Sequence, residues 1–304
     1  MIETGFSEIN INRSKYTGKN PWYLEVAITG SCNFKCKYCN SFKGDVDTGR
    51  LFGWLDTQPT LKHIQITGGE PTEHKRFDDI VSKLRGKTKT LGLSTNGSNY
   101  ISAKTLEKID MFSVSLDDYD WAILKLRGYR KINKVIDTIK HISTIKYVNV
   151  GMLIDELNVD RSEDIVDYIL SLGVSDVKLS VSSHSIATMP KFSKVYKNYP
   201  ILFYRVSNFK NGKPMRGYPN KTCFLAENDY TIVGDKHYPC LVYFREGGGH
   251  IGDVGDNMQR DRMAWSKSHI CTEDPICSKF CMDFKCDMNN EISRRRGLVA
   301  GPTR

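Results

Sequence analysis

Three cysteines follow the first apolar run of the chain, and they constrain its fold more than any other feature. Residues 22–29 are typical of a buried strand, and Cys32, Cys36 and Cys39 come directly after it. Three thiolates on one loop can hold one metal cluster, and a cubane 4Fe–4S cluster takes four ligands, so one iron would stay open to a small chelating molecule. A zinc site that lacks its fourth ligand, or a coincidental group of cysteines, would give the same spacing.

The nine cysteines fall into two groups, with a long cysteine-free stretch between them. The amino terminus lacks the basic start and apolar run of a signal peptide, and no apolar stretch is long enough to cross a bilayer. We therefore expect a cytoplasmic protein without a membrane partner, in which clustered thiols bind metal rather than form disulfides. The second group lies in the last third of the chain and comprises Cys223, Cys240, Cys271, Cys277, Cys281 and Cys286.

Short apolar runs alternate with amphipathic ones as far as about residue 207. Strands are predicted at 22–29, 63–67, 90–94, 112–116, 147–153 and 176–181, with an edge strand at 201–207. Helices are predicted at 76–84, 102–109, 130–142 and 162–172. Alternating units imply an α/β fold with a parallel sheet, and six units are too few to close an eight-stranded barrel. We expect a curved, partly open barrel with its working residues at the carboxyl ends of the strands.

The pattern divides the chain into four parts. Residues 1–21 form an amino-terminal extension, and residues 22–210 form the barrel. Residues 211–290 are rich in Pro, Gly, Asn and Cys, and this small irregular region is expected to depend on metal for its fold. Residues 291–304, which include Arg294, Arg295 and Arg296, form a basic tail that we expect to be mobile.

Two motifs together resemble the radical S-adenosylmethionine (SAM) superfamily. The first is the C-x3-C-x2-C spacing with an aromatic residue, Tyr38, immediately before the third cysteine. The second follows one strand later and reads Gly68, Gly69, Glu70 and Pro71. Alone, this second stretch would be an ordinary turn, but its position after the cysteine loop strengthens the resemblance, which covers about residues 22–207.

The resemblance implies a partial (β/α)6 TIM-like barrel with a 4Fe–4S cluster on Cys32, Cys36 and Cys39 whose open iron binds the amino and carboxylate groups of SAM. Tyr38 would lie beside the adenine, and the stretch Gly68 to Pro71 would hold the amine of the methionine part. Asn96 and Ser115, which end the third and fourth strands, are further candidates for SAM contact. A reductant such as flavodoxin or ferredoxin would supply the electron for SAM cleavage.

The second cysteine group resembles the SPASM and twitch extensions of that superfamily, which carry one or two auxiliary iron–sulfur clusters. Two departures stand out. Ser268 occupies a position where the family pattern has a cysteine, and Leu241 stands where sulfatase-activating relatives have an acidic base, so that activity is not expected. A zinc site on thiols left over from one cluster is the alternative.

An enzyme that abstracts a hydrogen atom from a substrate carbon is therefore predicted, although its general base and its reaction product are not identified by the sequence. The SPASM resemblance favours a peptide or protein substrate. The net charge of +9, and the cluster Lys125, Arg127, Arg130, Lys131 and Lys134, keep a nucleic acid base or nucleotide as the alternative. A solvated helix face is the favoured explanation of the cluster itself. A small-molecule dehydrogenase is third, and a non-catalytic iron–sulfur or zinc module, or a nucleic-acid binder with structural metal, is last.

Overall fold

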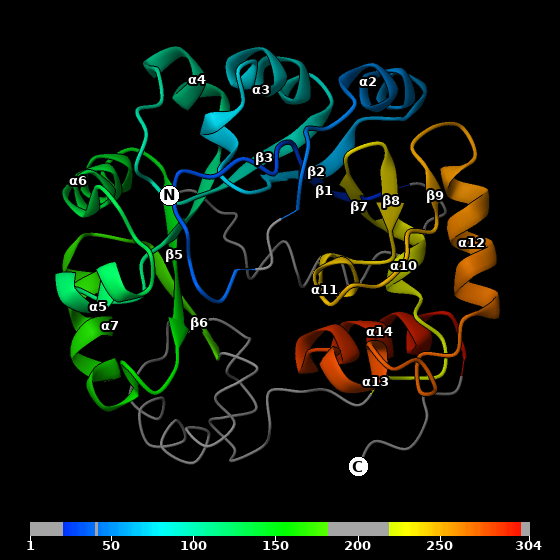
Figure 1. Cartoon of the computed structure of the whole chain (residues 1–304). Helices are drawn as coiled ribbons and strands as arrows, with labels where there is room; N and C mark the ends of the chain where they lie inside the picture. Colours follow the sequence, from blue (N-terminus) through cyan, green and yellow to red (C-terminus); the bar gives the residue numbers. More distant parts are fainter. Residues whose placement is uncertain (1–20, 40–41, 182–218, 299–304) are drawn as a thin grey trace.

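A single curved sheet organises the molecule (Figure 1). The structure is a computed structural model that describes residues 21–39, 42–181 and 219–298. Its strands lie in the order β6-β5-β4-β3-β2-β1-β7-β8-β9, and those from β6 to β7 are parallel. Their bounds are β1 (Tyr23–Ala27), β2 (Leu61–Thr67), β3 (Thr88–Thr95), β4 (Met111–Ser115), β5 (Tyr147–Ile154), β6 (Asp176–Val181) and β7 (Asp229–Val233), followed by the antiparallel β8 (Lys236–Tyr238) and β9 (Gly252–Asp253).

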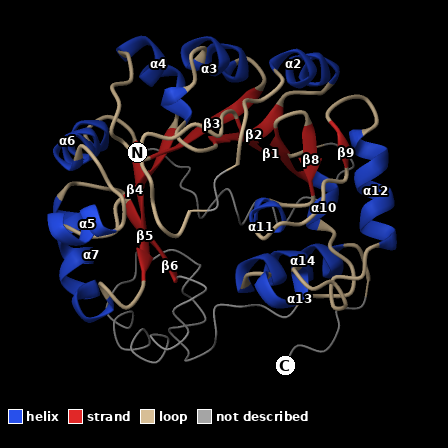
Figure 2. Cartoon of the chain, in the orientation of Figure 1, coloured by secondary structure: helices blue, strands red, loops and turns tan. Residues whose placement is uncertain are grey.

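Helices cover the outer face of this sheet along most of its length (Figure 2). They are α2 (Thr48–Thr57), α3 (Phe77–Arg85), α4 (Ala103–Lys108), α5 (Trp121–Leu126), α6 (Ile132–Ser143) and α7 (Ser162–Ser171), with short 3-10 turns at Pro71–Glu73 and Val159–Arg161. Parallel strands joined by helices, in a sheet that does not close, give the partial (β/α)6 barrel that the sequence predicted. The predicted fold class is confirmed.

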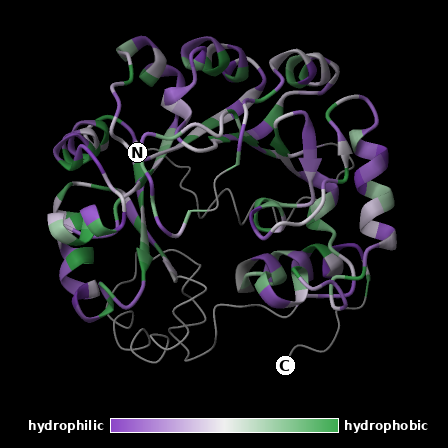
Figure 3. Cartoon of the chain, viewed as in Figure 1, coloured by the Kyte–Doolittle hydropathy of each residue, from purple (hydrophilic) through white to green (hydrophobic). Residues whose placement is uncertain are grey.

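The core lies between this helical layer and the sheet. In Figure 3, hydrophobic residues dominate β4 and β5, whereas the helices carry hydrophobic and hydrophilic residues on different faces. Helix α6 shows the cause, since Val135, Ile139 and Ile142 recur at three- and four-residue spacing and are fully or almost fully buried. This burial fixes each strand end in place, so the loops that follow the strands start from rigid positions.

The predicted strands and helices lie within a few residues of those observed. Gly173 follows α7 with a φ of +83°, a conformation that glycine adopts without strain. The sequence pattern missed α2, α5 and β7, and the predicted edge strand at 201–207 lies outside the described residues.

The cysteine-rich segment has more regular structure than its composition indicated. It contains α10 (Leu225–Asn228), α11 (Leu241–Arg245), α12 (Met258–Ser268), α13 (Cys277–Phe280) and α14 (Asp283–Arg295), and β7 continues the main sheet beside β1. Arg294 and Arg295 end α14 and pair with Glu291, so these arginines belong to a helix rather than to a tail. None of the described helices combines the length and the apolar character needed to cross a membrane.

Candidate active site

The loop that carries Cys32, Cys36 and Cys39 leaves the carboxyl end of β1 and is held by its backbone. Cys32 and Cys39 are exposed and Cys36 is partly buried. The amides of Lys35 and Lys37 donate to the carbonyls of Gly128 and Arg127, at 3.2 Å and 3.3 Å. These two carbonyls lie just after α5, so the loop is anchored to the far part of the barrel.

Gly128 makes this anchoring feasible for two reasons. Its φ of +92° lies in the left-handed region, and a Cβ built on it would be 2.1 Å from the Lys35 carbonyl oxygen. A side chain at this position would push the cysteine loop away from α5. Beneath the loop, the ring of Phe34 packs on Tyr129 with their centroids 5.0 Å apart.

The loop after β3 contacts the cysteine loop from the other side. The Asn96 side-chain amide donates to Asn33 Oδ1 at 2.7 Å and makes a longer contact of 3.9 Å with Cys32 Sγ, which also accepts from the Phe34 amide at 3.4 Å. Asn33 in turn donates to Ser98 Oγ at 2.8 Å. Donors aimed at sulfur stabilise thiolates in iron–sulfur sites. Asn96 was predicted to contact SAM, and the structure places it beside the first cysteine.

The electrostatics of the loop suit a bound cationic group. Burial raises the pKa of Cys32, and it raises the pKa of Cys36 to about 12 with help from the charge of Asp117. Without a cation the thiols of Cys32 and Cys36 are therefore protonated, and metal ligation would release these two protons. Cys32 and Cys39 also raise the pKa of Cys36 through their charges, so the three thiols lie within electrostatic reach of one another. Three clustered thiols with an amide donor beside one of them fit an iron–sulfur cluster with one open iron.

Gly68 and Gly69 bring the end of β2 against the start of the cysteine loop. A Cβ on Gly68 would lie 2.4 Å from the Thr29 carbonyl oxygen, and one on Gly69 would lie 2.3 Å from that of Ser31. The Gly69 amide donates to Thr29 O, and the Glu70 amide donates to Ser31 O, each at 2.7 Å. Both glycines are thus required by backbone contact between the two loops, whatever else binds there.

Glu70 is fully buried, and its carboxylate accepts four hydrogen bonds. Thr72 donates to Oε1 through its amide and its hydroxyl, the Thr95 hydroxyl donates to the same oxygen, and the Asn96 amide donates to Oε2 at 2.6 Å. Burial raises the pKa of Glu70, while these hydrogen bonds lower it, and the net direction is upward. The carboxylate joins the loops after β2 and β3. Its contact with a SAM amine stays a prediction, and Pro71 begins the 3-10 turn behind it.

Tyr38 takes part in a buried polar network that the sequence did not reveal. Its hydroxyl donates to Asp117 Oδ2 at 2.5 Å, and Arg127 Nη1 lies 3.0 Å from the same carboxylate. Arg127 also pairs with Asp155 and donates to the Leu153 carbonyl. Desolvation alone would lower the pKa of Arg127, but the charges of Asp117 and Asp155 raise it above its usual value. Arg127 is 2% exposed, so it does not belong to the basic surface cluster in which the sequence placed it.

Ser115 ends β4 at the same edge of the sheet and is exposed. In the sheet register, Ala27 pairs with Thr67, and Thr95 with Val114, so the ends of β1 to β4 lie side by side. The structure therefore brings Ser115 to the edge that carries the cysteine loop and Asn96. A small molecule at this edge could be contacted from four consecutive strands.

The six cysteines of the second group line one apolar cavity of about 50 Å³. Cys281 and Cys286 have sulfurs 3.4 Å apart, and Cys223 is hydrogen-bonded to Cys271. Burial raises the pKa of Cys240 to about 12, and the bond from Cys271 lowers that of Cys223. Converging thiols in an otherwise apolar cavity offer the kind of ligand that soft metals prefer.

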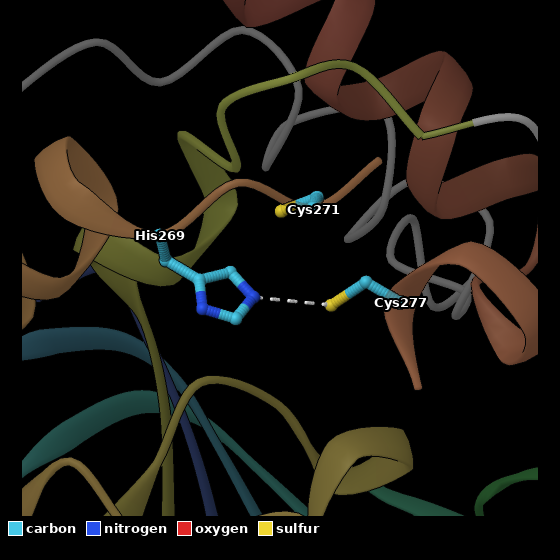
Figure 4. Close-up of side chains that lie close together, drawn as sticks. All are labelled: His269, Cys271 and Cys277. Carbon is cyan, nitrogen blue, oxygen red and sulfur yellow. Dashed lines mark hydrogen bonds between the residues drawn. The ribbon is translucent and has the colours of Figure 1, made fainter. Parts of the chain in front are cut away.

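His269 joins two of these cysteines, and the sequence analysis missed it. The ligand atoms of His269, Cys271 and Cys277 all lie within 4.8 Å of one another (Figure 4). The available signal was its position, directly after Ser268, which stands where the family pattern has a cysteine. Ser268 cannot replace that cysteine in this arrangement, because its exposed hydroxyl donates back to Ala264 O of its own helix at 3.0 Å.

A buried arginine supports the cavity from behind. Arg262 is fully buried on the inner face of α12, and its guanidinium donates to the carbonyls of Ala226, Asp229, Tyr238 and Pro239. Desolvation lowers its pKa to about 10. These carbonyls lie on the segments that connect Cys223 with Cys240, so one side chain fixes the path between the two cysteines.

The two cysteine regions contact each other. The rings of Phe42, just beyond the first cysteine loop, and Phe244 of α11 meet edge to face with centroids 5.7 Å apart. The Asp47 amide donates to the Gly234 carbonyl at 3.2 Å. The cavity lined by the second group therefore flanks the same side of the sheet as the first loop.

Known proteins share both the sequence pattern and the fold. The pattern of the radical SAM superfamily matches residues 26–169. A tungsten-containing aldehyde ferredoxin oxidoreductase cofactor-modifying protein of Pyrococcus furiosus is 29% identical over 181 residues, which are 52% of this chain and 51% of the relative. A GTP 3′,8-cyclase of Photorhabdus laumondii is 28% identical over 189 residues, which are 56% of this chain and 52% of the relative. The chain thus spans about half the length of these curated relatives.

A solved structure extends the likeness to the carboxyl-terminal region. Native anSMEcpe with bound AdoMet and Cp18Cys peptide matches with a TM-score of 0.63 at 16% identity, over 90% of this chain and 96% of that chain. At this identity the likeness concerns the fold.

Proposed function

Because the chain belongs to the radical SAM superfamily, we propose that Cys32, Cys36 and Cys39 hold its 4Fe–4S cluster. When bound, the cluster and SAM supply reductive cleavage of SAM to methionine and a 5′-deoxyadenosyl radical, which abstracts a hydrogen atom from substrate carbon. The observation that carries this proposal is the placement of the three thiols on a loop that the end of β2 and the residues after α5 hold by backbone contacts. The electron comes from an external reductant of the flavodoxin or ferredoxin type.

The protein's own residues position the reactants. Gly68 and Gly69 allow the end of β2 to approach the loop closely, and we assign the SAM amine to this backbone edge with the charge of Glu70 behind it. Asn96 orients Cys32, and Ser115 lies exposed at the same edge for a polar contact with SAM. Tyr38, fixed through its hydroxyl by Asp117, offers a ring face to the adenine.

We further propose that the carboxyl-terminal cavity holds auxiliary metal. Cys223, Cys240, Cys271, Cys277, Cys281 and Cys286 all line it. The contacts between the two cysteine regions support a position of such a group near the edge where the substrate would bind. There the group could bind substrate or carry away an electron after hydrogen abstraction.

A peptide or protein side chain is the substrate that we propose. The fold likeness to anSMEcpe, whose structure contains a peptide, runs over nearly the full described chain and includes the cysteine-rich region. A nucleotide is the second candidate, because the GTP 3′,8-cyclases are closer in sequence, although their similarity covers about half of each chain.

Iron analysis and SAM cleavage test the cofactor assignments. The reconstituted wild type should hold about eight irons if the cavity binds a cubane cluster, or about four with zinc in the cavity. The triple variant Cys32→Ala, Cys36→Ala, Cys39→Ala should lose about four irons and all 5′-deoxyadenosine formation with dithionite as reductant. A matched triple variant, Cys240→Ala, Cys281→Ala, Cys286→Ala, should keep SAM cleavage. If the first variant still cleaves SAM, the assignment of the first site fails.

Deuterium transfer tests the substrate class. The enzyme is incubated with SAM and either deuterated GTP or a mixture of peptides with perdeuterated side chains. Deuterium in 5′-deoxyadenosine with the peptides alone supports the proposal. Deuterium transfer with GTP alone would replace the peptide proposal by the nucleotide alternative. No transfer from either probe would reject both GTP and these peptides as substrates.

A further inference from the structure

The six thiols of the second cysteine region are not equivalent, because an imidazole lies beside two of them. His269 ends α12, and Figure 4 shows its ring directed at Cys277, with Cys271 beside both. The distance from His269 Nε2 to Cys277 Sγ is 3.8 Å, and Cys271 is buried with an exposure of 2%. We propose that His269, Cys271 and Cys277 bind one tetrahedral divalent metal ion of the zinc class, separate from any iron–sulfur cluster.

The spacing of the three ligand atoms favours a shared ion. Zinc–sulfur and zinc–nitrogen bonds of about 2.3 Å and 2.0–2.1 Å place tetrahedral ligands about 3.6–3.8 Å apart. The observed 3.8 Å between Nε2 and Sγ agrees, and no pair in the group exceeds 4.8 Å.

The imidazole is held in place by its surroundings. Trp265 stacks on the ring with centroids 4.0 Å apart and an interplanar angle of 17°, and Tyr243 meets the ring edge to face at 5.9 Å. Asp274 Oδ2 lies 3.6 Å from Nε2 and accepts from the Tyr243 hydroxyl at 3.0 Å, while its other oxygen accepts from the amides of Ile276 and Cys277. Asp274 Oδ2 therefore faces Nε2, the same ring nitrogen that faces Cys277, so its carboxylate lies beside the proposed ion rather than on the opposite ring nitrogen.

The thiols that remain in the cavity are enough for a separate cluster. Removing Cys271 and Cys277 from the cavity leaves Cys223, Cys240, Cys281 and Cys286, which are four thiols, the number that a 4Fe–4S cluster takes. Cys223 is hydrogen-bonded to Cys271 but is not part of the group within 4.8 Å. Two cysteines and one histidine match zinc sites that keep a fourth position for water or substrate. This inference rests on the proposed metal-binding role of the cavity.

The experiment uses the full chain purified without oxygen, with zinc and iron counted by mass spectrometry and the zinc environment measured by X-ray absorption. We expect about one zinc per chain, with two sulfurs at about 2.3 Å and at least one nitrogen near 2.0 Å. His269→Ala should weaken zinc binding more than about tenfold, which is the lower limit when even a supporting partner of a ligand is removed. His269→Cys should retain zinc with three sulfurs, and His250→Ala, an exposed histidine, should behave as the wild type.

Iron content separates loss of the ligand from loss of the fold, because His269→Ala should keep all the iron of the wild type. A wild type without zinc, zinc bound by sulfur alone, or zinc that is unchanged in His269→Ala would each overturn the inference. Loss of iron in His269→Ala with retention of iron in His269→Cys would do so as well, since it would place an iron–sulfur cluster at this site. SAM cleavage is measured on the same samples, so a failure of the proposed function appears there and not in the zinc signal.

Discussion

One buried arginine supports each of the two cysteine regions, but the charges of the two arginines are compensated by different groups. Arg127 lies between Asp117 and Asp155, and its pKa is raised. Arg262 is surrounded by backbone carbonyls, and its pKa is lowered to about 10. Opposite charges compensate a buried cation more completely than carbonyl dipoles do. We therefore expect the first loop to be rigid before any cofactor binds, whereas the second region would gain stability from the metal that we propose for it.

Replacing Arg127 with Met should give the largest loss of stability. The variant leaves the carboxylates of Asp117 and Asp155 without their cation, and breaking a buried network in this way typically costs about 3–5 kcal/mol. Urea unfolding of the wild type and the variant, followed by circular dichroism, measures the difference. Lys125→Met is the control, because Lys125 is exposed on α5 and should change the free energy of unfolding by less than about 0.5 kcal/mol. A loss equal to that of the control would show that the network does not hold the loop.

Replacing Arg262 with Met should have a smaller effect on stability and a more local one. No buried carboxylate is stranded by the change, but several carbonyls lose their donor, which we expect to cost about 2–3 kcal/mol. Metal should leave the carboxyl-terminal cavity while SAM cleavage persists. Arg260→Met, on the exposed side of the same helix, is the matched control. If SAM cleavage disappeared together with the cavity metal, the two regions would not be independent.

The pH dependence of the free energy of unfolding should also distinguish the second region, because that region contains the buried imidazole of His237. This imidazole is fully buried beside Arg262, and desolvation, then the arginine charge, lower its pKa to about 3. The unfolded chain then binds the proton more tightly than the folded one, so stability falls as the pH drops below about 6.5 and continues to fall toward about 3. At pH 5 the loss is about 2 kcal/mol relative to neutral pH.

Comparing His237→Gln with the wild type at pH 7.5 and pH 5 isolates this contribution. The variant should lose about 2 kcal/mol less than the wild type over that interval, since no imidazole is left to protonate. His141→Gln, at an exposed position on α6, should follow the wild type. Parallel curves for the wild type and His237→Gln would refute the assignment.

The sequence alone predicted the candidate site residues better than it predicted the buried side chains that support them. The cysteine triad and Gly68 to Pro71 form local patterns at strand ends, and six alternating strands predicted the barrel. Arg262 was missed because a charged residue on the core face of α12 removes the helical pattern of apolar positions. Strand β7 was missed because it is short and pairs with β1, far away in the chain. The role of Asp117 depends on contacts with Tyr38 and Arg127 that no spacing reveals.

Tyr38 offers the smallest and most selective test, because its hydroxyl and its ring have separate roles. Tyr38→Phe removes the donor to Asp117, and we expect a loss of about 1 kcal/mol because the side chain is partly open to solvent. The ring survives in this variant, so SAM affinity measured by calorimetry should stay within about twofold of the wild type. Tyr38→Ala removes the ring as well and should weaken SAM binding about tenfold, as expected for a lost aromatic stack. Tyr100→Phe, at an exposed tyrosine, controls for the mutation itself. Equal SAM affinities for Tyr38→Phe and Tyr38→Ala would show that Tyr38 only supports the loop. A weaker SAM affinity of Tyr38→Phe than of the wild type would show that the adenine site also needs the ring position fixed by Asp117.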